Sequence, residues 1–146
     1  MRSSVNSSVI IERPVEEVYS YVVDLASNGS EWAPDLESVE KVTDGPIGVG
    51  TRFQQVQHVM GKRRKTSLAF TAVEPNQRIE AAFKAGPMDV SMNAMFDKAG
   101  DGTRVTIDGT ASGRGPLRLL SPVFARQGQK IWDARLASLK RVMENS

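Results

Sequence analysis

Apolar and polar residues alternate along several segments of the second half of the chain. One such segment has apolar residues at every second position, namely Met88, Val90, Met92, Ala94 and Phe96. A second has Val105, Ile107, Gly109 and Ala111. Because successive side chains of a strand point to opposite faces, this period of two predicts strands with one apolar face and one wet face. The same reasoning assigns six further residues to the apolar face, namely Leu68, Phe70, Ala72, Ile79, Ala81 and Phe83.

Turn-forming residues separate these segments at regular intervals from Leu36 onward. They stand at residues 44–46, 61–62, 74–76, 85–87, 100–102 and 113–115. Six strands fit around these turns, with no room for helices between them, so we expect an antiparallel meander and not parallel βαβ units.

The N-terminal segment predicts one more strand followed by a helix. Residues 5–12 are rich in β-branched side chains, which favours a strand. Pro14 ends this strand and suits the first position of a helix, and the acidic residues from Glu16 onward lie where the helix dipole favours negative charge. We expect the helix to reach about Asp24, followed by a loop or a short second helix through Trp32.

The last predicted element is a long amphipathic helix. Ser121 and Pro122 supply an N-cap and a first-turn proline, so we expect the helix to begin there, after a separate turn over residues 116–120. At about 100° per residue, one stripe of this helix carries Phe124, Gly128, Ile131, Arg135, Leu139 and Val142. A sheet with one apolar face needs a cover, which this helix can provide.

Two residues interrupt the apolar stripe of the helix. Arg135 is a candidate polar anchor for a bound molecule, since a guanidinium presents a fork of donors. The alternatives are an arginine whose head reaches solvent, or one that pairs with a carboxylate on a strand. Gly128 costs about 1 kcal/mol of helix stability relative to alanine, so we expect either close packing against the sheet or room for a ligand there.

Composition narrows the possible chemistry. The chain has no cysteine and one histidine, which excludes thiolate nucleophiles, cysteine-containing metal sites and sites with several imidazoles. A net charge of +2 does not indicate a polyanionic partner. The basic run at residues 62–65 is short and lacks interleaved aromatic residues, so we expect a solvated hairpin tip and no nucleic acid partner.

His58 is the obvious general base if the protein has one, because its ordinary pKa lies near neutrality. The strand that holds it has two possible phases. One phase places Gln55 and Gln57 inside, and the other places His58 inside. Since His58 is close to the turn at Gly61, we expect it at the rim or on the surface. No pair of carboxylates is evidently placed for acid–base catalysis.

The chain has no apolar run of the roughly 20 residues that a transmembrane helix requires, and its first residues lack the apolar stretch of a signal peptide. We therefore expect no transmembrane segment and a cytoplasmic location. A length of 146 residues fits one domain over residues 1–146, present as a monomer or homodimer.

Four segments, taken in order, resemble the START-like (SRPBCC) helix-grip superfamily, specifically its polyketide cyclase/dehydrase and lipid-transport branch. They are residues 11–19 (IERPVEEVY), Asp24 together with residues 32–34 (WAP), residues 48–53 (GVGTRF) and residues 136–141 (LASLKR). The resemblance covers nearly the whole chain. It implies an α+β helix-grip fold, in which a seven-stranded antiparallel sheet curves around a long C-terminal helix, with two short helices between the first two strands.

The resemblance also implies a deep, largely apolar cavity between the sheet and the C-terminal helix, which binds a hydrophobic or amphipathic small molecule. Because each buried methylene contributes about 0.8 kcal/mol, we expect binding without a cofactor or metal. The ligand would be lipid-, polyketide- or quinone-like. The candidate ligand-binding residues are Arg135, Phe124, Gly128, Ile131, Trp32, Phe53, Phe70, Phe83, Met88 and Met92.

Two alternative functions remain open at this point. The first is a cofactor-independent polyketide cyclase or dehydratase that uses the same cavity, although no catalytic residue can be named. The second is a protein-interaction module that uses its outer surface. A buried His58 with a carboxylate partner would favour the enzyme, whereas an exposed apolar patch over a filled core would favour the interaction module.

Overall fold

The computed structural model describes residues 3–59, 61–85, 88–113 and 121–145, and its strands form one antiparallel sheet. The strands are β1 (Ser3–Ile11), β2 (Leu36–Lys41), β3 (Arg52–Val59), β4 (Lys62–Glu74), β5 (Arg78–Ala85), β6 (Met88–Ala99) and β7 (Gly102–Gly113). The helices are α1 (Val15–Val23), α2 (Leu25–Trp32) and α3 (Ser121–Glu144). This is the expected α+β helix-grip fold.

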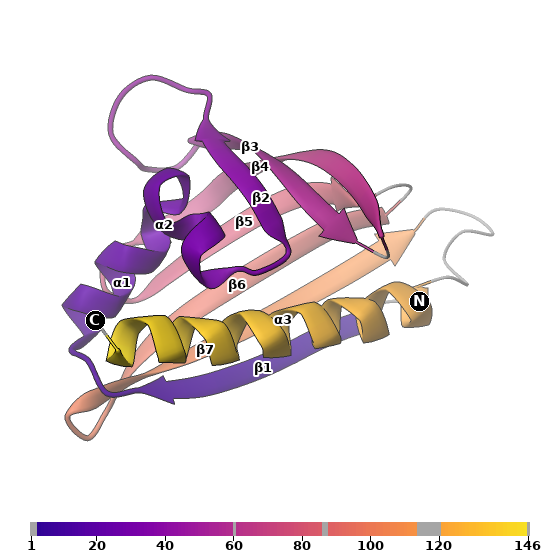
Figure 1. Cartoon of the computed structure of the whole chain (residues 1–146). Coiled ribbons are helices and arrows are strands. Elements are labelled where there is room, and N and C mark those ends of the chain that lie inside the picture. Colours follow the sequence, from indigo (N-terminus) through magenta and orange to yellow (C-terminus); the bar gives the residue numbers. More distant parts are fainter. Residues whose placement is uncertain (1–2, 60, 86–87, 114–120, 146) are drawn as a thin grey trace.

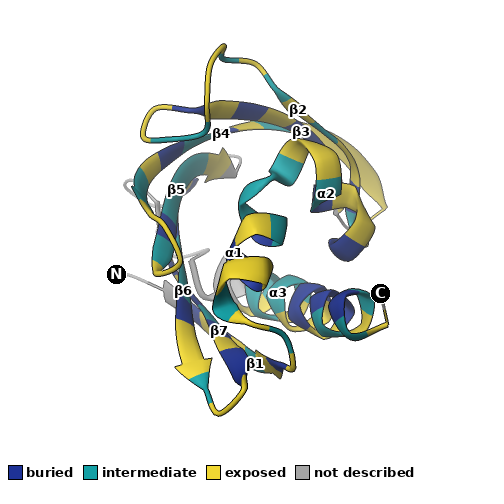
Figure 2. Cartoon of the chain, turned by 90° about the vertical axis from the view of Figure 1, so that its left-hand side faces the viewer, coloured by how far each residue is buried: buried dark blue, intermediate teal, exposed yellow. Residues whose placement is uncertain are grey.

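The seven strands lie in the order β1-β7-β6-β5-β4-β3-β2, so β1 and β2 are the two edges of the sheet. The long helix α3 runs along β1 and β7 (Figure 1). Viewed along the helix, the sheet curls around α3, and α1 and α2 lie in the opening on its concave side (Figure 2). The helices thus lie on the concave side of the sheet (Figure 2).

The apolar face predicted from the alternation forms the inner face of this curved sheet. Phe96 lies opposite Val105, and Met92 lies opposite both Ala81 and Gly109. Helix α1 packs on this face, and the rings of Tyr19 and Phe96 meet edge to face with centroids 5.4 Å apart. Several side chains of the core are fully buried, among them Ile11, Val18, Val105, Leu136 and Leu139.

Strand β4 contains an irregularity that the alternation does not reveal. Between Phe70 and Ala72 the register with β5 shifts, so that Val73, and not Ala72, lies opposite Ile79. A β-bulge of this kind inserts one residue and turns all later side chains to the other face. The prediction that Ala72 belongs to the inner face is therefore wrong, and Val73 packs against the core in its place.

The two short helices are separated by Asp24. This residue ends α1, and its side chain accepts a hydrogen bond from the Ser27 amide at 3.4 Å, which satisfies a free donor at the start of α2. Pro14 lies just before α1 in an extended conformation, one position earlier than the sequence suggests. The predicted turn at residues 116–120 lies outside the described residues. None of the described helices is long and apolar enough to cross a membrane.

Candidate ligand-binding cavity

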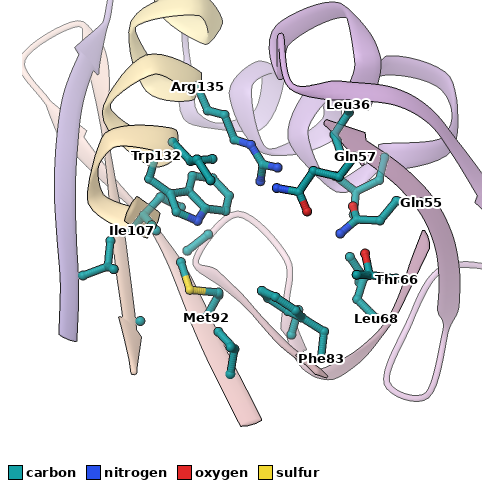
Figure 3. A pocket seen from close by; sticks show the side chains of 18 of the residues that line it. Leu36, Gln55, Gln57, Thr66, Leu68, Phe83, Met92, Ile107, Trp132 and Arg135 are labelled. Carbon is teal, nitrogen blue, oxygen red and sulfur yellow. The ribbon is translucent and has the colours of Figure 1, made fainter. Parts of the chain in front are cut away.

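A cavity of about 760 Å³ lies between α3 and the concave face of the sheet. This volume is within the range of about 300 to 1,000 Å³ that is typical of small-molecule sites. One wall is apolar and comes from β1, β5, β6 and β7 (Figure 3). Its side chains include Val5, Ala81, Phe83, Val90, Met92 and Ile107.

The opposite wall is polar and comes from the hairpin of β3 and β4. Gln55 lies opposite Thr66 in the antiparallel register, and Gln57 lies opposite Arg64. Because directly opposed residues of two strands share a face, these four side chains stand together on the concave side. Figure 3 shows Gln55 and Gln57 pointing into the space across from Met92 and Phe83.

Helix α3 contributes Arg135, Trp132, Ile131 and Gly128 to the cavity. The Arg135 guanidinium lies over the Trp132 ring, 4.7 Å from its centroid, a distance at which the cation and the ring attract. The Trp132 ring in turn lies 6.2 Å from that of Trp32, which ends α2. The helix thus carries an aromatic and a cationic group to the same part of the wall.

Arg135 forms a two-point ion pair with Asp35, which immediately precedes β2. Its Nε donates to Oδ1 at 2.7 Å and its Nη2 donates to Oδ2 at 2.6 Å. Gln57 Nε2 also donates to Asp35 Oδ2, at 2.8 Å. Arg135 therefore pairs with a carboxylate, which is one of the alternatives that the sequence left open. The carboxylate lies just before a strand, however, and not on it.

The environment of Asp35 contains opposing effects on its ionisation. Burial alone would raise the pKa of this carboxyl, but the hydrogen bonds and charge of Arg135, together with the hydrogen bond from Gln57, lower it below its ordinary value. Asp35 therefore stays ionised at neutral pH, and its charge balances that of Arg135.

Several polar groups of the wall have no partner among the described residues. Trp32 Nε1 and Thr66 Oγ1 are buried without a hydrogen bond. Gln55 as a residue is only 6% exposed, and its amide, which borders the cavity, has no hydrogen bond to the residues that the structure describes. Since buried polar groups are usually hydrogen-bonded, this concentration beside a cavity is unusual.

Seven of the ten candidate residues line this cavity, namely Trp32, Phe70, Phe83, Met92, Gly128, Ile131 and Arg135. Phe53 and Met88 are fully buried in the core and are not part of the wall. The Phe53 ring packs on that of Phe70, with centroids 5.0 Å apart. The side chain of Phe124 lies outside the described residues. A role in ligand binding for these residues remains a prediction.

Gly128 allows a close approach between α3 and the edge strand β1. A Cβ atom at this position would lie 3.2 Å from Val5 Cγ2, closer than ordinary van der Waals contact. Close packing therefore accounts for this glycine, which also borders the cavity.

His58 lies outside the cavity. Its side chain is exposed, with Nε2 3.4 Å from Glu37 Oε1, so the phase that places Gln55 and Gln57 inside is the correct one. The basic run is also exposed, as expected, and Arg63 pairs with Glu37 at 2.6 Å. However, Arg64 and Lys65 of this run border the cavity, which the sequence did not indicate.

Sequence reasoning did not single out Trp132, Thr66 or Asp35. Trp132 had a detectable signal, since it lies four residues after Gly128 and so shares its side of the helix. Thr66 could have been assigned to the cavity only if the pairing register of β3 and β4 had been known, because that register places it opposite Gln55. Asp35 lies in a connection between elements, where periodicity gives no information.

An open sheet curled around one long helix, with a cavity between them, defines a helix-grip protein. The family model described as polyketide cyclase/dehydrase and lipid transport matches residues 2–144. The chain therefore belongs to this family.

Solved structures share the fold over nearly the full length of the chain. A START superfamily protein from Mycobacterium smegmatis has a TM-score of 0.82 and 16% identity, covering 99% of each chain. A protein from Thermus thermophilus has a TM-score of 0.80 and 25% identity, covering 98% of this chain and 99% of the other. The Zhui aromatase/cyclase from Streptomyces sp. R1128 has a TM-score of 0.80 and 14% identity, covering 99% and 94%. No curated protein matches the chain in sequence.

Proposed function

We propose that this protein binds a hydrophobic or amphipathic small molecule in the cavity under α3 and acts as its carrier or sensor. The observation that carries the proposal is a cavity of about 760 Å³ with an apolar wall on one side and hydrogen-bonding groups on the other. Each Å² of apolar ligand surface removed from water contributes about 25 cal/mol. A lipid-like or polycyclic molecule would therefore bind by burial alone, without a metal or cofactor.

The side chains of the wall favour binding over acid–base catalysis. No carboxyl or imidazole group occurs among the described residues that line the cavity. General acid–base catalysis requires a titratable group within hydrogen-bond reach of the substrate. Among the described lining residues, the amines of Lys65 and Lys84 have no carboxyl or imidazole partner in the wall, and His58 is exposed, so the cyclase or dehydratase alternative has no acid–base pair there.

The two tryptophans of the chain, Trp32 and Trp132, both line the cavity and provide a direct assay. We expect tryptophan fluorescence to change saturably when aliphatic or polycyclic molecules are titrated into the protein. Native mass spectrometry of gently purified protein would identify a ligand that is retained from the cell.

Neighbouring alanines on β5 supply a matched pair of variants. Ala81 lines the cavity, whereas Ala82 lies on the other face of the strand. We expect Ala81→Phe to fill part of the cavity and to weaken uptake at least tenfold, while Ala82→Phe leaves uptake nearly unchanged. Equal uptake by both variants, at similar melting temperatures, would show that the cavity is not the binding site.

A further inference from the structure

The polar wall contains a built cluster of hydrogen-bonding groups at one place in the cavity. Gln55 and Gln57 lie two residues apart on β3, and both side chains point inward, beside the Arg135 guanidinium (Figure 3). All three belong to the lining of the cavity. A ligand that fills the cavity would therefore contact these groups.

Several hydrogen-bond donors and acceptors of the cluster have no partner among the described residues. Gln57 Nε2 donates to Asp35, but no described residue donates to Gln57 Oε1. The Gln55 amide has neither a donor nor an acceptor partner among the described residues. Arg135 uses Nε and Nη2 on Asp35, which leaves Nη1 without a described partner. The cluster thus offers both donors and acceptors to a ligand.

The cluster carries almost no net charge. The Arg135 and Asp35 side chains are only 9% and 15% exposed, and their two-point contact pairs one positive charge with one negative charge. Three further cations, Arg64, Lys65 and Lys84, border the cavity without an ion-pair partner among the described residues, but all three are exposed to solvent. An anion placed between the two glutamines would lose its hydration without gaining an unpaired buried cation, and it would lie near the Asp35 carboxylate.

We propose that Gln55 and Gln57 form a subsite for an uncharged oxygen group, a hydroxyl or a carbonyl, while the apolar wall holds the carbon skeleton of the same molecule. This inference rests on the proposed binding function and specifies its ligand class. A pure hydrocarbon of the same shape would bind more weakly, because it would displace water from the Gln55 amide and the Gln57 carbonyl oxygen without replacing its hydrogen bonds. A carboxylate would also bind more weakly, because the subsite has no uncompensated buried cation.

Four probes that share one carbon skeleton test this ligand class. They are cyclooctane, cyclooctanol, cyclooctanone and cyclooctanecarboxylate, and tryptophan fluorescence or calorimetry measures their binding to the intact protein. We expect cyclooctanol and cyclooctanone to bind about tenfold more tightly than cyclooctane, which corresponds to one or two hydrogen bonds in a buried site. We expect the carboxylate to bind no better than the hydrocarbon at neutral pH.

Substitutions on β3 test whether Gln55 causes the expected preference for cyclooctanol over cyclooctane. Gln55→Leu is expected to remove most of the difference between cyclooctanol and cyclooctane while leaving cyclooctane binding intact or improved. Gln55→Met tests the same point with a more flexible apolar side chain if the leucine variant is poorly folded. Gln54→Leu is the matched control, since Gln54 is exposed on the outer face of the same strand.

The outcomes separate this inference from the proposed function. If no probe binds, the proposed function is contradicted, and the subsite with it. If cyclooctane binds as tightly as cyclooctanol, the cavity binds ligands but the subsite is contradicted. Tighter binding of the carboxylate than of cyclooctanol would overturn the assignment to uncharged groups. An unchanged preference for the alcohol in Gln55→Leu would also overturn the inference.

Discussion

Arg135 on α3 and Asp35 before β2 form an ion pair between residues 100 positions apart in the sequence. Helix α3 packs on β1, one edge of the sheet, and this pair connects it to the start of β2, the other edge. The helix and the pair together therefore span the opening of the curved sheet. Arg135 serves this connection through two of its nitrogens and borders the cavity at the same time.

Replacing Arg135 by methionine should destabilise the protein by about 3 kcal/mol. The variant leaves the Asp35 carboxylate mostly buried without its cation, and removing one partner of a buried pair is more costly than removing both. The measurement is the free energy of unfolding in urea at pH 7. The control is Lys130→Met on an exposed position of the same helix, which should change stability by less than about 0.5 kcal/mol.

The double variant Arg135→Met/Asp35→Asn should recover a large part of the loss. No uncompensated charge remains in it, and the amide oxygen of the introduced asparagine can still accept a hydrogen bond from Gln57. A double variant as unstable as Arg135→Met alone would mean that the pair is not the origin of the effect.

The ion pair should make stability depend on pH in the acid range. The pKa of Asp35 is lower in the folded protein than its ordinary value, so its ionised form stabilises the fold. This contribution is complete above the unfolded value of about 4 and is lost as the pH falls through the folded pKa. The wild-type protein should therefore exceed Asp35→Asn in stability at pH 7, and the difference should shrink below about pH 4. Parallel pH profiles of the two proteins would contradict this assignment.

Gly109→Ala should disturb the apolar wall of the cavity. A Cβ atom at Gly109 would overlap the Met92 sulfur and lie 2.8 Å from Met92 Cε, so the Met92 side chain, which lines the cavity, must shift. We expect a loss of about 1 to 2 kcal/mol in stability, as for other overpacked sites, and weaker ligand uptake. In a Met92→Ala background the same substitution should have a much smaller effect, as thermal unfolding and titration would show. Equal effects in both backgrounds would exclude Met92 as the cause.

Thr66→Val should stabilise the protein by about 1 kcal/mol. The Thr66 hydroxyl is buried without a hydrogen-bond partner among the described residues, and valine keeps its branched shape without the polar atom. Thr103→Val is the contrasting control, because the fully buried Thr103 hydroxyl donates to the Arg13 carbonyl at 2.8 Å. We expect that control to lose about 1 kcal/mol in urea unfolding experiments. A destabilised Thr66→Val would indicate that its hydroxyl has a partner in solution.

Most of the fold follows from local patterns in the sequence. The alternation around Met92 and Ile107 and the predicted start of the long helix at Ser121 each depend on a few neighbouring residues, and the structure has the corresponding strands and a helix that begins at Ser121. The bulge after Phe70 does not follow in this way. A shift of one residue leaves both phases of a short apolar run plausible, and only pairing with β5 selects between them.

The site was less accessible to sequence reasoning for a related reason. The helical stripe identified Arg135 and Gly128, since both lie on one long element with a regular period. The partners of Arg135 depend on tertiary structure, because Asp35 lies in a connection and Gln57 is on a strand with two plausible phases. Contacts between elements distant in sequence, and not local preference, determine the polar wall.

The bulge divides β4 into two stretches that differ in how amino-acid substitutions affect the cavity and the core. Before it, Thr66 and Leu68 face the cavity, and Leu68 also belongs to the core, whereas Val73 after it packs into the core without lining the cavity. A substitution at Thr66 can therefore alter the lining of the cavity without repacking the core. In a family whose members share a fold at low sequence identity, this separation would let ligand preference diverge while the scaffold persists.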